Sequence, residues 1–120
     1  MNSYAILLRQ IKERTSFDIY YKDTVSDTRQ MPYIEYAITP ISDDGVKSMD
    51  KLEFRIYTKT FSESYKINNQ IRSILLHQGD LIGGLFYNVE LSGGGSLLGL
   101  DGKSNIHISY YKILKKSEAI

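Results

Sequence analysis

Residues 52–79, LEFRIYTKTFSESYKINNQIRSILLHQG, decide the fold, because a strand pattern passes directly into a helix pattern. Apolar and polar side chains alternate from Leu52 to Thr58, which predicts a half-buried strand. Thr60 and Glu63 have the spacing of a capping box, in which each side chain satisfies a backbone N–H at a helix start. A helical apolar stripe follows, with Gly79 as a plausible stop: Ile67, Ile71, Ile74 and Leu75.

The segment before this stretch predicts a partner strand. Pro32 suits a first strand position, where its missing N–H leaves the hydrogen-bond ladder intact, and alternation continues to about Ile41. Residues 42–45, SDDG, have turn composition, and the connection extends to Asp50. We therefore expect the strands 32–41 and 52–58 to pair as an antiparallel hairpin.

The two ends of the chain complete the predicted fold. Residues 4–14 have the periodicity of an amphipathic helix capped by Asn2 or Ser3, residues 17–21 predict a short strand, and residues 22–30 a surface loop. Further strands are expected at 86–91 and 106–114, joined by a Gly-rich loop, before a frayed tail at 115–120. The prediction is one α+β domain over residues 1–120: a mostly antiparallel sheet of four or five strands, a central helix packed on one face, and an additional N-terminal helix.

The composition is that of an ordinary globular domain. The 120 residues carry 15 basic and 14 acidic side chains, so no strong charge favours DNA or an anionic membrane. The chain has no cysteine, which excludes disulfides and thiol chemistry and fits an intracellular protein. The N-terminal sequence lacks the features of a signal peptide, and its apolar run is too short to span a bilayer. Ten tyrosines and no tryptophan suit half-buried sheet faces and interfaces.

Motifs that would carry chemistry are weak. The Gly-Lys-Ser at residues 102–104 resembles the end of a P-loop, but Leu97 and Leu98 occupy the cradle and a strand follows where a helix is required. His77 suits a helix C-terminus and His107 a strand, and the aspartates that would join them in a metal site occupy turns. No serine sits in a Gly-x-Ser-x-Gly elbow. We therefore predict no catalytic residue, no metal site and no cofactor.

A basic and aromatic cluster near the C-terminus has the residue types that bind single-stranded nucleic acid by charge and stacking. Tyr110 and Tyr111 fall on opposite faces of a strand, so they cannot form one stacking platform. A solvated strand end is the preferred interpretation.

The order of elements over residues 31–114 resembles the small tail-terminator and head–tail joining proteins of long-tailed bacteriophages and prophages. The resemblance rests on the opening strand MPYIEY (31–36), the strand LEFRIYT (52–58), the helix that begins SESY (62–65) and the closing strand IHISYY (106–111). It implies a structural subunit of the virion, assembled in the bacterial host cytoplasm. It also implies a six-fold ring of identical subunits that ends tail growth and contacts the tail tube and the head–neck proteins. DNA would pass through the ring without sequence-specific binding, and no membrane is involved.

Three surfaces are candidates for the contacts between subunits. They are the hairpin connection at Asp43, Asp44 and Gly45, the exposed face carrying Tyr57, and a leucine loop with Leu97, Leu98 and Leu100. The leucines would either order against a neighbouring subunit or fold back over the core. The alternatives are another neck or minor capsid protein, a peptide-binding module that uses a sheet edge, and an enzyme.

Overall fold

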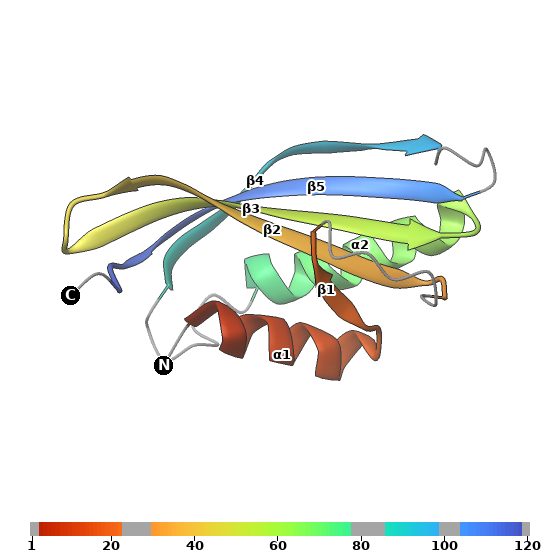
Figure 1. Cartoon of the computed structure of the whole chain (residues 1–120), viewed down its shortest axis with the longest axis horizontal. Helices are drawn as coiled ribbons and strands as arrows, with labels where there is room; N and C mark the ends of the chain where they lie inside the picture. Colours follow the sequence, from red (N-terminus) through yellow and green to blue (C-terminus); the bar gives the residue numbers. More distant parts are fainter. Residues whose placement is uncertain (1–2, 23–29, 78–85, 99–103, 119–120) are drawn as a thin grey trace.

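The computed structural model describes residues 3–22, 30–77, 86–98 and 104–118, and they form an α+β fold (Figure 1). The prediction of an N-terminal helix, a central helix and a mostly antiparallel sheet is confirmed. In chain order the elements are α1 (Ser3–Thr15), β1 (Ile19–Tyr21), β2 (Tyr33–Asp43), β3 (Lys47–Thr58), α2 (Phe61–His77), β4 (Phe86–Leu98) and β5 (Asn105–Lys116).

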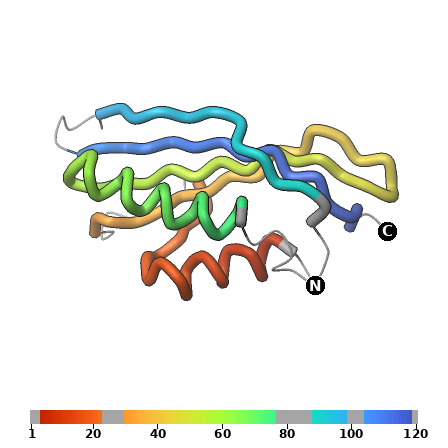
Figure 2. The backbone as a smooth tube through the Cα atoms, turned by 180° about the vertical axis from the view of Figure 1, so that it is seen from behind, coloured from red at the N-terminus to blue at the C-terminus, as the bar shows by residue number. Residues whose placement is uncertain are grey.

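The strands form one five-stranded sheet in the order β1-β2-β3-β5-β4. β1 is parallel to β2, and the other neighbours are antiparallel, including the expected β2–β3 hairpin. Both helices lie on the same face of the sheet (Figures 1 and 2). The opposite face has no helix among the described residues.

The core lies between the sheet and the two helices. Alternation along β3 turns Leu52, Phe54 and Ile56 toward the helices, where all three are fully buried. The apolar stripe of α2 packs against them because residues three and four apart share one side of a helix. α1 adds Tyr4, Leu7 and Ile11 to the same cluster.

α2 begins where the capping pattern places it. The Thr60 side-chain oxygen accepts the Glu63 backbone N–H at 3.2 Å, so Thr60 is the N-cap. The predicted stop at Gly79 lies outside the described residues.

The prediction of a loop after Leu91 is wrong for residues 92–98. β4 continues through the glycines to Leu98 because it pairs with β5 in an antiparallel ladder between Asn105 and Lys115. The register shifts between Leu91 and Gly94, and Gly94 passes so close to β5 that a Cβ there would lie 2.3 Å from the Ile108 carbonyl oxygen. Glycine has a low strand propensity, but it is favoured where the backbones of two strands approach each other closely.

The β2–β3 hairpin is longer than the alternation predicts. β3 starts at Lys47, inside the predicted connection, and pairs with β5 as far as Lys116. The first two residues of the predicted tail, 115–116, are therefore strand, and Lys115 is buried. The hairpin projects from one end of a molecule that measures 45 × 26 × 24 Å (Figure 1). We call residues 39–47, all exposed, the arm.

Candidate functional site

The turn of the arm is built by its own aspartates, as the sequence predicts. Asp43 Oδ1 accepts the Gly45 N–H at 2.8 Å, and Asp44 Oδ1 accepts the N–H groups of Val46 and Lys47 at 2.8 and 2.7 Å. Gly45 has a φ of 87°, a conformation that favours glycine. The N–H groups of Lys47 and Val46 lower the pKa of Asp44, so its carboxylate stays ionised to a lower pH than an ordinary aspartate.

The arm carries apolar side chains whose exposure to water is unfavourable. Ile41 is 51% exposed and Val46 is 67% exposed, one on each side of the acidic turn. Ser117 fastens the arm to the end of the chain, because its N–H donates to the Val46 carbonyl oxygen at 2.9 Å and its hydroxyl to Asp43 Oδ1 at 2.8 Å. The hydrogen bonds of Ser117 therefore hold the arm in place, and its tip carries both apolar and acidic side chains.

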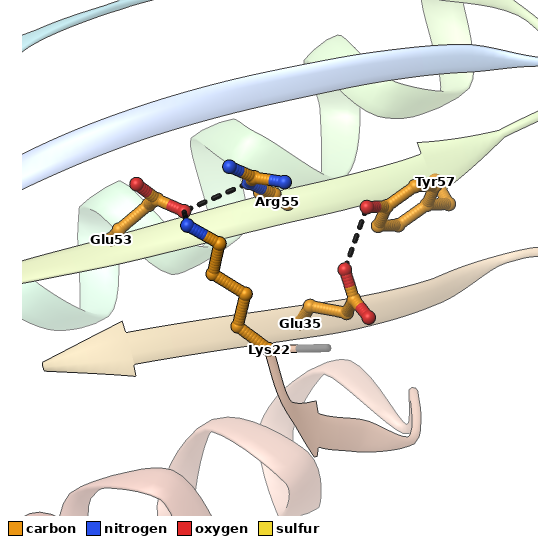
Figure 3. Close-up of polar contacts among 5 residues, drawn as sticks. All are labelled: Lys22, Glu35, Glu53, Arg55 and Tyr57. Carbon is orange, nitrogen blue, oxygen red and sulfur yellow. Dashed lines mark hydrogen bonds and ion pairs between the residues drawn. The ribbon is translucent and has the colours of Figure 1, made fainter. Parts of the chain in front are cut away.

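Tyr57 lies on the sheet face opposite the helices, as expected from alternation. Its ring stacks on Tyr33 with centroids 4.6 Å apart, and Tyr20 packs edge-on against Tyr33 at 6.1 Å. The Tyr57 hydroxyl donates to Glu35 Oε1 at 2.6 Å (Figure 3). Ring contacts and the hydrogen bond to Glu35 thus hold a half-buried group of tyrosines on this face: Tyr20, Tyr33 and Tyr57.

Two carboxylates on this face are buried although no helix covers them. Glu35 and Glu53 are 7% and 8% exposed. Arg55 Nε donates to Glu53 at 2.8 Å, and Lys22 Nζ lies 3.8 Å from the same oxygen (Figure 3). The hydrogen bond to Glu35 and the ion pairs of Glu53 account for the burial of these two carboxylates as a structural feature, without a catalytic role.

The bond between Tyr57 and Glu35 predicts a pH dependence. Burial, followed by the hydrogen bond to Glu35, raises the pKa of Tyr57 to about 12 from 10.0. Between these values the folded chain keeps a proton that the unfolded chain has lost, so the free energy of unfolding falls as pH rises. We expect Tyr57→Phe to make this fall shallower in urea titrations from pH 9 to pH 12. The exposed Tyr65→Phe is the matched control, and an unchanged slope in Tyr57→Phe would contradict the assignment.

The predicted leucine loop is not a loop where it is described. Leu97 and Leu98 belong to β4, pair with Ile106 and Asn105, and therefore point to opposite faces of the sheet. Both are exposed, Leu98 at 69%, so neither folds back over the core. Leu100 lies outside the described residues. The two leucines lie on the outermost strand of the sheet.

A hollow that the sequence reasoning missed lies between α2 and the glycines of β4. Asn68, Arg72 and His107 line it, and the Ser96 hydroxyl is 2.8 Å from His107 Nδ1. Burial lowers the pKa of His107. A serine beside a neutral histidine is the start of a nucleophile–base pair, which also needs a third group to orient the base. The lining residues include no carboxylate, so the pair is incomplete among the residues that the structure describes.

A second feature missed from the sequence is a shallow groove between the C-terminal end of α1 and the outer side of α2. Arg14 and Lys66 line it together with Tyr65 and several polar side chains. Phe61 and Tyr65 stack with centroids 5.9 Å apart and are both more than half exposed. Their i, i+4 spacing away from the buried stripe was the available signal. We call Arg14, Tyr65 and Lys66 the α2 groove, and Phe61 stacks on its Tyr65.

The described residues include no group of three or more histidine, aspartate or glutamate side chains placed to hold a metal ion. Among them, neither helix has the length and apolar composition needed to cross a bilayer.

Comparison with known proteins gives a structural match alone. No family model matches the sequence, and no curated protein matches it. Among solved structures, the fold is similar to a chain in the virion of a native gene transfer agent particle, with a TM-score of 0.70 and 12% sequence identity. The similarity covers 96% of this chain and 92% of that chain, so the two share the fold over nearly their whole lengths.

Proposed function

We propose that this protein is a structural subunit of a phage-type virion. The observation that carries the proposal is the similarity, over nearly the full length of both chains, to a chain found in an assembled gene transfer agent particle. A fold alone does not define a function. The surfaces described above supply the second argument, since they suit contact with other proteins better than chemistry on a small substrate.

Within the virion, we propose that the subunit forms a ring that ends tail growth and joins the tail to the head. A ring of identical subunits needs a heterologous interface, in which one patch contacts a different patch of the next copy. The chain offers separate patches for this purpose, at the arm and along the β4 edge. This role requires no catalysis, no metal and no cofactor, and its partners would be the tail tube and the head–neck proteins, with DNA passing through the ring.

The test is the oligomeric state across a concentration series, measured by native mass spectrometry together with negative-stain imaging. Closed rings with an axial hole would support the terminator role. Open filaments or irregular aggregates would contradict ring closure. A monomer at every concentration would favour the alternative described below.

The alternative is a peptide-binding module that uses a sheet edge. β4 is one of the two edge strands, and residues 88–98 include no buried side chain, which suits the addition of a strand from a partner. This alternative predicts a stable monomer that protects β4 amides from hydrogen exchange when it binds an extended peptide.

The two β4 leucines provide a direct test of that edge as a subunit interface. We expect Leu97→Ser with Leu98→Ser to raise the concentration for half-assembly by about tenfold, because exposed apolar contacts are lost at the interface. The melting temperature of the monomer should stay unchanged, since both side chains are exposed. Sedimentation velocity measures the first quantity and circular dichroism the second. Unchanged assembly would remove Leu97 and Leu98 from the interface.

A further inference from the structure

We propose that the arm tip of one copy docks in the α2 groove of the next copy. The inference rests on the proposed ring and names two patches that meet in it, in addition to the contact tested along the β4 edge. It concerns which surfaces meet, so it can fail while the ring itself stands.

The arm tip supplies an apolar and acidic surface. Ile41 and Val46 flank the turn and are both more than half exposed. The turn uses Oδ1 of Asp43 and Oδ1 of Asp44 for its internal hydrogen bonds. Lys47, at the end of the arm, is a cation that interacts with Asp44, and the two carboxylates against this one lysine leave the arm with a net negative charge.

The α2 groove supplies the complementary surface. The stacked Phe61 and Tyr65 rings present exposed aromatic area, and Lys66 and Arg14 line the same groove with amide side chains such as Asn69 and Gln70. The acidic residue of α2, Glu63, lines an adjoining hollow with Phe17 and Pro32, and this hollow shares Lys66 and Gln70 with the groove. The charges of tip and groove are therefore opposite, and each pairs with apolar area, which is the composition of a specific protein interface.

The positions of the two patches favour contact between copies. α2 begins after the end of β3 that lies farthest from the arm, and α1 ends just before β1, which pairs with the start of β2. The tip of the hairpin projects beyond both helices at one end of the longest axis, and the two helices that line the groove lie beneath the rest of the sheet (Figure 1). A tip that cannot reach its own groove contacts the groove of a neighbour, and repetition of this contact gives a head-to-tail assembly.

A charge exchange tests the contact. The tip variant is Asp43→Asn, Asp44→Asn and Val46→Lys, in which each asparagine keeps a side-chain oxygen for the turn while the tip becomes basic. The groove variant is Lys66→Glu with Gln70→Glu, both at exposed positions of α2. We expect each variant to raise the concentration for half-assembly about tenfold or more, because like charges then face each other. The chain that carries both sets should return to within about threefold of the original value, since opposite charges again meet.

The matched control is Arg9→Glu, which makes the same charge change as Lys66→Glu at an exposed position of α1 outside the groove. It should assemble as the unmodified chain does, and circular dichroism melts should show that all variants remain folded. Rings that form equally well in every variant would overturn the docking while leaving the ring intact. Loss of rings in the tip variant without rescue in the combined chain would overturn it too, and would assign the tip to another protein. An unmodified chain that forms no ring would overturn the proposed ring together with the docking.

Discussion

A Gly94→Ala variant is expected to lose about 3 kcal/mol of unfolding free energy or more, the range of a strained backbone that also clashes. The added Cβ would lie 2.3 Å from the carbonyl oxygen of Ile108 and 3.0 Å from the Cα of Ser109. Both contacts are with backbone, so relief requires β4 to move away from β5. The φ of 153° adds strain for any residue with a side chain. Urea denaturation followed by circular dichroism measures the loss.

The neighbouring glycine is the matched control for this substitution. A Cβ at Gly95 meets nothing within 4 Å. We expect Gly95→Ala to change stability by less than about 1 kcal/mol, and a reduction in the entropy of the unfolded chain favours a small gain. Equal stability of the two variants would show that β4 does not approach β5 as closely as described.

The second large effect is expected for Phe54→Ala, with a loss of about 3–5 kcal/mol of unfolding free energy. Phe54 is fully buried at the centre of β3, and its ring lies edge-on to Tyr111 with centroids 6.1 Å apart. Its removal leaves a cavity between the sheet and α2 that the surrounding side chains fill only in part. The free energy from urea denaturation of the monomer measures this loss.

Phe61→Ala is the matched control, because it removes the same ring from an exposed position. We expect a change of less than about 1 kcal/mol in monomer stability, as is usual for surface substitutions. The same variant should assemble less well, since Phe61 stacks on Tyr65 of the α2 groove. A Phe61→Ala chain that assembles normally would argue against the groove as a docking surface, and a stable Phe54→Ala chain would contradict the described core.

The parts of the fold that were predicted correctly depend on local chemistry. Alternation from Leu52 to Thr58 places every second side chain on one face, and the structure buries that face. The cap at Thr60 and the turn at Asp43, Asp44 and Gly45 follow from side-chain oxygens that bond backbone groups two or three residues away. Such signals are complete within a few residues, so a single sequence contains them.

The parts that were missed depend on pairing between distant segments. Residues 93–95 are three glycines, whose propensity favours a loop, and only the ladder offered by β5 makes them a strand. The placement of Leu97 and Leu98 on opposite faces follows from that ladder. The α2 groove joins Arg14 of α1 to residues of α2 more than forty positions later. No local pattern predicts which helix faces meet.

The candidate surfaces divide in the same way. The acidic turn and the Tyr57 face were located from the sequence, because each lies on a single element with clear chemistry. Their neighbours were not: Ser117 on the turn and Lys22 beside Glu53 come from elsewhere in the chain. The subunit contacts assigned to these surfaces stay predictions.

The buried carboxylates of Glu35 and Glu53, on the sheet face opposite the helices, affect how β2 and β3 align during folding. A β2 strand that slipped by one residue would turn Glu35 toward the apolar layer beneath the helices, because side chains alternate with a period of two. Burial of an unpaired carboxylate there costs several kcal/mol, so the mispaired hairpin is disfavoured when the helices dock on that face. Glu35 and Glu53 thereby favour one alignment of β2 with β3. The arm residues of these strands are exposed, so burial in the core does not set their alignment.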